Sequence, residues 1–314
     1  MIRLHYQVAL SYEVDGPDGA DFIFNIHAAR TPCQVVEQET LTLSQDVPCE
    51  VATDAATASR FARVHAEAGR LDVQYRAVVA ITHHRADPGT LHEVPVRCLP
   101  LEVLPYVYPS RYCQSDRLLR FAFNAFGHLP PGYARVKAIQ DWVQRHVTFT
   151  SNTSTGTTSA LDTLIEQVGV CRDFTHLMIA LCRAVNIPAR VATGTDHGAD
   201  PALGPPDFHA YVEAYLGDRW YLFDASGTGI PMGFLRLGTG RDAADVAFAT
   251  MFGPVTSSPP TVRVDVLDGP GTEQPRHVDD ALSTSPVSLA VGERCPPVPT
   301  PAAASGQAES LLPD

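Results

Sequence analysis

The sequence contains little positive charge and almost no lysine. Its 314 residues include 23 lysines and arginines against 35 aspartates and glutamates, which gives a net charge of −12. Lys137 is the only lysine. A protein that binds the phosphates of nucleic acid needs a broad basic surface. We therefore expect no nucleic-acid partner.

Long apolar stretches are also absent. No run of residues approaches the ~20 apolar residues that a membrane-spanning helix needs. Residues 1–6, Met-Ile-Arg-Leu-His-Tyr, lack the apolar segment of a secretory signal. We expect a cytoplasmic protein with no membrane partner. The sequence gives no indication of the oligomeric state.

The seven cysteines are an odd number, and no two of them have the Cys-x-x-Cys spacing that is typical of zinc sites and redox pairs. The chain also has no loop of alternating acidic residues that resembles a calcium site. We expect free thiols, no metal ion and no other cofactor.

Residues 1–105 have the alternating pattern of β-strands. Apolar residues occupy every second position from Leu4 to Tyr12 and from Leu71 to Val79. Clusters of Pro, Gly, Asp and Ser separate these segments from similar ones, as turns do. The pattern predicts an antiparallel β domain over residues 1–105.

The pattern changes after this region. Apolar residues at intervals of three and four predict helices over residues 117–126 and 136–147, and Ser159 is a candidate cap of a short helix. Beyond Asp268 the chain is rich in Pro, Ala, Ser and Thr, which is typical of disordered segments. We expect a second domain over residues 106–268 and a disordered tail over residues 269–314.

Cys171 lies at the start of a predicted helix of residues 171–185, because apolar residues recur from Phe174 onward and Pro188 follows. A thiol in a first helical turn faces the positive end of the dipole and free N–H groups, which favour the thiolate. A lone cysteine is more often a small buried apolar residue, as we expect for Cys182. A nucleophilic Cys171 therefore needs a base from elsewhere.

Residues 208–224 predict a β-hairpin that supplies such a base. A two-residue type II′ turn at residues 217–218 makes Asp224 the diagonal neighbour of His209 on one sheet face. Diagonal neighbours lie ~7–8 Å apart, within reach of a carboxylate–imidazole contact. A three-residue loop would instead put them on opposite faces. Glu213 shares the face of His209 but lies about 13 Å along the strand, too far to pair with it.

Four motifs of this sequence resemble those of the transglutaminase-like superfamily. That family has Gly-x-Cys-x-Asp, Ile-Pro-Ala-Arg, His-Ala-Trp-x-Glu and Trp-x-x-x-Asp in this order. The matching stretches are Gly169-Val-Cys-Arg-Asp173, Ile187-Pro-Ala-Arg190, His209-Ala-Tyr-Val-Glu213 and Trp220-Tyr-Leu-Phe-Asp224. Tyr211 stands where the family usually has tryptophan. The resemblance covers about residues 1–268 and is similar to bacterial members with a β-rich amino-terminal region.

The resemblance implies an α+β fold, in which an antiparallel β domain precedes a papain-like, transglutaminase-like domain. It implies that Cys171 is the nucleophile, His209 the base and Asp224 the orienting acid. The implied activity is acyl transfer on an amide of a peptide or protein through a thioester, with hydrolysis favoured over crosslinking. The alternatives are a catalytically silent module that binds peptides or assembles with a partner, and a Cys/His metal site that lacks evident further ligands. Trp142 and Asn152 are candidate oxyanion donors besides the backbone N–H of Cys171.

Overall fold

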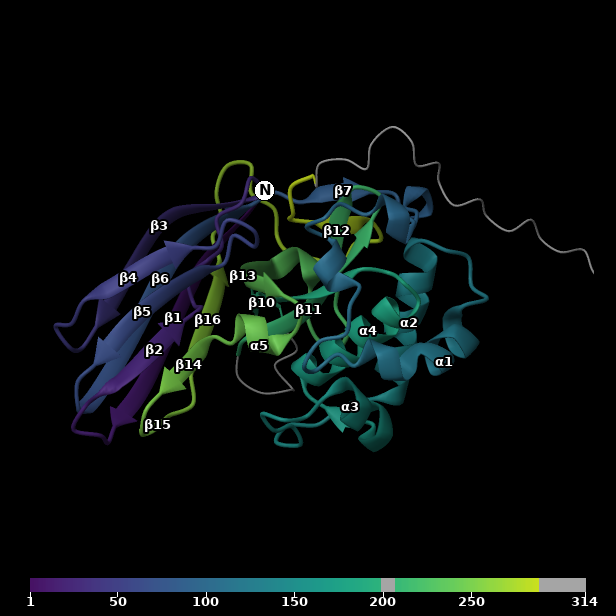
Figure 1. The fold of residues 1–314 in the computed structure, drawn as a ribbon. Coiled ribbons are helices and arrows are strands. Elements are labelled where there is room, and N and C mark those ends of the chain that lie inside the picture. Colours follow the sequence, from purple (N-terminus) through teal and green to yellow (C-terminus); the bar gives the residue numbers. More distant parts are fainter. Residues whose placement is uncertain (199–206, 288–314) are drawn as a thin grey trace, which may run out of the picture.

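The computed structural model of the protein describes residues 1–198 and 207–287 (Figure 1). The α-helices are α1 (Ser115–Phe126), α2 (Tyr133–His146), α3 (Ala160–Glu166), α4 (Cys171–Ala184) and α5 (Ala243–Val246). The 3₁₀-helices are η1 (Pro88–Thr90), η2 (Val96–Cys98), η3 (Leu104–Tyr106) and η5 (Pro231–Gly233). The strands are β1 (Ile2–Val14), β2 (Ala20–Phe24), β3 (Gln34–Leu43), β4 (Cys49–Thr53), β5 (Arg60–Ala66), β6 (Gly69–Ile81), β7 (His84–Ala86), β8 (Thr148–Phe149), β9 (Val168–Gly169), β10 (Ala189–Asp196), β11 (His209–Leu216), β12 (Arg219–Phe223), β13 (Phe234–Gly240), β14 (Ala249–Phe252), β15 (Val255–Ser257), β16 (Thr261–Val266) and β17 (Ala281–Ser283).

The first six strands build an antiparallel β-sandwich, drawn in purple and blue at the left of Figure 1. One sheet has the order β15-β1-β6-β3, with β16 also paired to β1, and the other has the order β14-β2-β5-β4. The even-numbered residues of β1 are buried and the odd-numbered ones are not, as the alternation predicts. Between the sheets, the ring of Tyr12 lies 5.0 Å from that of Phe22. The expected β-rich amino-terminal region is confirmed.

Three later strands return to this sandwich. β14 pairs with β2, and both β15 and β16 pair with β1. These strands belong to the stretch of residues 106–268 that the sequence assigns to the second domain. The sandwich therefore contains strands from both sides of the predicted boundary at residues 105–106, and the division into domains stays a prediction.

A third antiparallel sheet, of order β12-β11-β10-β13, lies between the sandwich and the helices (Figure 1). Helix α4 packs on β10 and β11, and α1, α2 and α3 surround α4 in one apolar core. On the opposite side, Leu235 and Leu237 of β13 are buried in the core of the sandwich. This sheet is therefore covered on both faces, which explains why every residue of β11 is buried.

The helices agree with their predicted positions. Ser159 is the N-cap residue of α3, and its backbone N–H donates to Oδ2 of Asp162 at 2.9 Å. Helix α4 begins at Cys171 and is buried from Asp173 to its end, because it is the central helix of the core. Cys182 of this helix is fully buried, as expected for a small apolar residue.

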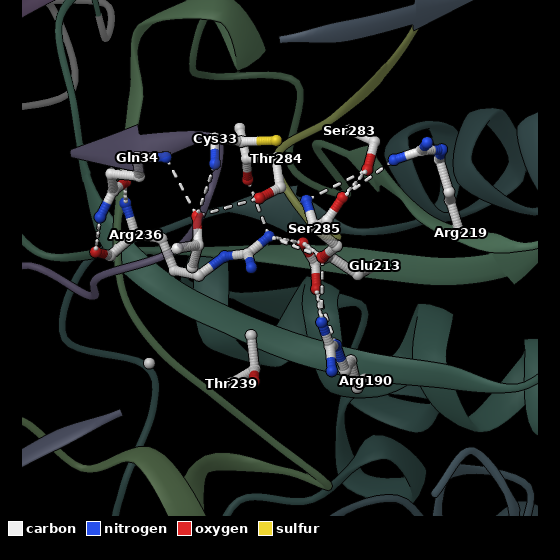
Figure 2. A network of polar contacts seen from close by, with 12 residues as sticks. Cys33, Gln34, Arg190, Glu213, Arg219, Arg236, Thr239, Ser283, Thr284 and Ser285 are labelled. Atoms are coloured by element: carbon white, nitrogen blue, oxygen red, sulfur yellow. Dashed lines mark hydrogen bonds and ion pairs between the residues drawn. The ribbon is translucent and has the colours of Figure 1, made fainter. Parts of the chain in front are cut away.

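The prediction of a disordered tail over residues 269–314 is wrong for residues 269–287. β17 pairs with β7, and residues 281–285 are buried. The hydroxyl groups that make this segment look disordered have partners in the fold: Oγ1 of Thr284 accepts from Arg236 at 2.8 Å, and Oγ of Ser285 accepts from Arg190 at 3.1 Å (Figure 2). Residues 288–314 lie outside the described residues.

Candidate active site

The hairpin of β11 and β12 has the predicted register. Leu216 pairs with Arg219, as a two-residue turn requires, and the pairing continues to Val212 opposite Phe223. Gly217 has φ of 61°, a conformation that favours glycine and that a type II′ turn needs at its first central position. The hairpin therefore brings the end of β12 back beside the start of β11.

His209 and Asp224 meet at this end of the hairpin. Nε2 of His209 lies 3.4 Å from Oδ1 of Asp224, and both side chains are nearly inaccessible to solvent. Asp224 also accepts hydrogen bonds from the backbone N–H of Ser226 at 3.0 Å and of Gly229 at 2.7 Å. Burial raises the pKa of Asp224, but the contacts with His209 and these donors outweigh it and lower the pKa. Asp224 is therefore held as a carboxylate.

Helix α2 fixes Asp224 from the other side. The side-chain amides of Gln140 and Gln144 both donate to the backbone carbonyl of Asp224, at 2.7 and 2.9 Å. These two residues are four apart and so lie on one face of α2. The aspartate thus has its backbone and its carboxylate held by separate elements.

Cys171 is the first residue of α4 and is half-buried. The helix start is fixed by Asp173, whose fully buried carboxylate accepts from the N–H of Val170 and from Oγ of Ser154, both at 2.9 Å. A Cβ atom at Gly169 would lie 2.7 Å from Cβ of Asp173, so this packing requires glycine there. The thiol therefore lies at the positive end of a helix dipole with a rigid first turn.

His209 also lies near Cys171. Burial lowers the pKa of His209, but its interactions with Asp224 and with Cys171 raise it well above its usual value. Because Nε2 faces Asp224, Nδ1 is the ring nitrogen that remains for the thiol. The structure thus brings the three sequence-predicted residues together, with His209 between a carboxylate and a thiol.

Glu213 does not compete for His209. It is fully buried and bonds to Arg190 at 2.7 Å and to Arg236 (Figure 2). Of the two candidate oxyanion donors, Trp142 stacks on His146 within the helical layer, with ring centroids 4.0 Å apart, and Asn152 is exposed in the loop before α3. A catalytic role for either residue stays a prediction.

The structure adds Asp196, which the sequence did not single out, and gives a partner to Tyr211, which the alternation of the strand already placed on the face of His209. The hydroxyl of Tyr211 donates to Oδ2 of Asp196 at 2.7 Å, and the Tyr211 ring lies 4.8 Å from the ring of His209. Asp196 lies at the end of β10, where a mixed sequence gives no signal of a buried carboxylate. The only available hint was Tyr211 itself, since it replaces the usual tryptophan of the motif.

Cysteine chemistry differs from the expectation at one position. Cys33, Cys49, Cys113, Cys171 and Cys182 are free thiols. Cys98 is disulfide-bonded, so the expectation that all seven cysteines are free is wrong there. Within residues 1–198 and 207–287, no group of three or more His, Cys, Asp and Glu side chains has the arrangement of a metal site.

Comparisons with known proteins match most of the chain. Residues 120–225 match the transglutaminase-like superfamily, and residues 2–102 match the bacterial transglutaminase N-terminal domain. A solved structure from Cytophaga hutchinsonii, described as a "putative cysteine protease", is 38% identical with a TM-score of 0.83, over 90% of this chain and 97% of that one. The chain belongs to the transglutaminase-like superfamily. Its fold is accordingly α+β, with a β-rich amino-terminal region and a transglutaminase-like domain.

The chain is also similar to an uncharacterized protein of Mycobacterium leprae, ML0607, to which it is 31% identical over 116 residues. That match spans 36% of the transglutaminase-like chain and 42% of the length of the relative. In the part of the chain that the structure describes, no helix has the length and apolar content that crossing a membrane requires.

Proposed function

We propose that Cys171, His209 and Asp224 form a catalytic triad that transfers the acyl group of a peptide or protein amide through a thioester. The family and the fold support a thiol-dependent enzyme. The observation that carries the finer proposal is the position of His209, which bonds to Asp224 and lies near Cys171 while nearly inaccessible to solvent. A buried histidine whose pKa is raised by a carboxylate and a thiol is the arrangement that thiolate–imidazolium chemistry requires.

In this mechanism Nδ1 of His209 takes the proton of the Cys171 thiol, and the thiolate attacks the amide carbonyl carbon. The tetrahedral intermediate expels the amine, which receives its proton from His209, and leaves a thioester on Cys171. The backbone N–H of Cys171 lies in the first turn of α4, where N–H groups have no partner within the helix, and can donate to the oxyanion. Asp224 holds the ring orientation throughout.

Water resolves the thioester in the reaction we favour. His209 removes a proton from the water, which attacks the thioester carbon and releases a carboxylic acid and the Cys171 thiol. Hydrolysis is favoured over crosslinking because the similar solved structure is described as a cysteine protease rather than a crosslinking enzyme. A cytoplasmic location and a substrate that is neither nucleic acid nor membrane remain parts of this proposal.

Selective alkylation tests the triad. The intact protein is treated with limiting iodoacetamide at pH 7, and each adduct is quantified by peptide mass spectrometry. Cys33 and Cys49 are matched controls, because they are half-buried free thiols like Cys171. We expect Cys171 to react at least about tenfold faster than either control, and Cys171→Ala to lower amide hydrolysis of a peptide library at least about 10³-fold.

The control variant for hydrolysis is Cys33→Ala, which should keep full activity. If Cys171 is labelled no faster than Cys33, and the unmodified protein hydrolyses no amide, the results favour the catalytically silent binding module instead. Release of ammonia or amine without uptake of an added amine into the product supports hydrolysis, and uptake of the amine contradicts it.

A further inference from the structure

A second buried carboxylate lies beside His209. Asp196 is 6% exposed, and its Oδ2 accepts a hydrogen bond from the hydroxyl group of Tyr211 at 2.7 Å. The Tyr211 ring is fully buried and meets the His209 ring edge to face, at 68° and 4.8 Å between centroids. A tyrosine whose ring supports the histidine and whose hydroxyl is fixed by a carboxylate restricts the ring of His209.

The same pair is joined to Asp224 through two consecutive backbone N–H groups. Gly229 donates to Oδ2 of Asp224 at 2.7 Å, and the backbone N–H of the next residue, Ile230, lowers the pKa of Asp196. A Cβ atom at Gly229 would overlap both Oδ2 of Asp196 and the hydroxyl of Tyr211. The side chains of Asp196 and Tyr211 therefore pack against the backbone at Gly229, which binds the carboxylate of Asp224.

Five groups of the described residues lie around His209. They are the thiol of Cys171 at the start of α4, the carboxylate of Asp196 at the end of β10, the carboxylate of Asp207 just before β11, the phenol of Tyr211 in β11 and the carboxylate of Asp224 after β12. The pKa of Asp196 is raised above its usual value, mainly by burial and also by the charge of Asp224, while His209 and the Tyr211 hydroxyl lower it. The ionised form of Asp196 is thus favoured by a protonated His209 and by the tyrosine.

We propose that Asp196 and Tyr211 are positioning residues for His209, and that the negative charge of Asp196 keeps His209 protonated to higher pH. The inference rests on the proposed triad. It assigns a role to the tyrosine that replaces tryptophan in the His209 motif, because the Tyr211 hydroxyl donates to the buried carboxylate of Asp196 at 2.7 Å. Neither residue touches the substrate carbonyl in this proposal.

The test needs no substrate. An anionic alkylating reagent, iodoacetate, is attracted to a thiolate that has an imidazolium beside it, whereas neutral iodoacetamide is not. The ratio of the two rate constants at Cys171 therefore falls as His209 loses its proton. We measure this ratio against pH for the unmodified protein, Tyr211→Phe, Asp196→Asn and the control Tyr75→Phe.

Tyr75 is a close match for Tyr211. It is also fully buried, and its hydroxyl also donates to a carboxylate, Oε2 of Glu39, at 2.7 Å, but it lies in the sandwich. A general effect of losing a buried tyrosine hydroxyl will appear in both phenylalanine variants. An effect on His209 will appear only in Tyr211→Phe.

We expect the fall in the ratio to move to lower pH by about one unit in Asp196→Asn, because a nearby negative charge is removed. A smaller shift in the same direction is expected for Tyr211→Phe, because Asp196 without its donor is less often ionised, and no shift is expected for Tyr75→Phe. Unchanged profiles in both site variants would overturn the inference while leaving the triad intact. A Cys171 that reacts no faster than Cys33 in the unmodified protein would instead remove the triad itself.

Discussion

Replacing Glu213 by glutamine should destabilise the protein strongly, because one carboxylate neutralises two buried arginines. Glu213 is fully buried, and its Oε2 bonds to Arg190 at 2.7 Å while its Oε1 bonds to Arg236 (Figure 2). Arg236 is 2% exposed and Arg190 is 7% exposed. Glutamine keeps the shape of the side chain but removes the charge, so it leaves two guanidinium groups inside the protein.

The magnitude follows from the partners that remain. Arg190 retains the aromatic face of Trp220, at 4.2 Å from its guanidinium carbon, which stabilises a cation. Arg236 retains only neutral oxygens, those of Thr284 at 2.8 Å and Ser285 at 3.2 Å. Breaking a buried ion pair on one side costs about 3–5 kcal/mol. Against a total stability of about 5–15 kcal/mol, this is a large fraction.

Urea unfolding at pH 7, followed by circular dichroism, measures the loss. The control is Glu39→Gln in the sandwich, where the carboxylate pairs with Arg60 at 2.6 Å but its side chain is 21% exposed. The second arginine paired with Glu39, Arg30, has a side chain that is 59% exposed, and the buried Arg60 keeps a hydrogen bond to the backbone carbonyl of Ala28 at 3.2 Å. We therefore expect a loss of only about 1–2 kcal/mol. The reasoning fails if Glu213→Gln costs less than about 1 kcal/mol or no more than the control.

Two further predictions concern acidity and packing. Burial lowers the pKa of His27 to about 4 and that of His176 to about 3. Unfolded histidine has a pKa near ~6.5, so below that pH the unfolded chain binds protons that the folded protein does not. The free energy of unfolding is therefore unaffected by these residues above pH ~6.5 and falls by about 1.4 kcal/mol per histidine and pH unit below it. Urea midpoints between pH 7 and pH 5 test this, and His27→Asn should flatten the slope by about one proton; an unaltered slope would contradict the assignment. Gly229→Ala should lower the free energy of unfolding by about 1–3 kcal/mol, because the added methyl group overlaps Asp196. The same change should slow the alkylation of Cys171. Normal alkylation kinetics in this variant would show that the site tolerates the methyl group.

The hairpin and helix α4 could be predicted because their determinants are local. Gly217 and the residue after it set the turn, the turn sets the register, and period-two alternation then places Asp224 on the face of His209. The start of α4 at Cys171 follows in the same way from apolar spacing and a stop signal at Pro188. Each of these inferences uses residues within one element or its nearest turn.

The late strands and the ordered tail could not be predicted because their partners are distant in sequence. β16 is exposed on alternate positions and becomes a strand by pairing with β1, more than 250 residues earlier at Leu4 and Val266. The segment at Ser285 is polar and without periodicity, and its place in the fold depends on Arg190 and Arg236, which both donate hydrogen bonds to the Ser285 hydroxyl oxygen. Asp196 was missed for the same reason, since nothing near it in sequence reveals Tyr211.

The arrangement of β11 explains why the candidate site needs the sandwich. His209, Tyr211 and Glu213 occupy alternate positions and so share one face of the strand. Each of these buried polar groups has an ionic or hydrogen-bonding partner, respectively Asp224, Asp196 and the two arginines.

A row of buried charges of this kind is stable only where water is excluded and all partners are fixed. The amino-terminal region supplies part of that fixation through Gln34, whose side chain donates to the backbone carbonyl of Arg236 at 2.8 Å and accepts from its N–H at 2.9 Å. Residues 281–285 cover the same row from the carboxyl-terminal side. The face of β11 that holds His209 is therefore closed at its Glu213 end by segments that are distant in the sequence, through Gln34 on one side and Ser285 on the other.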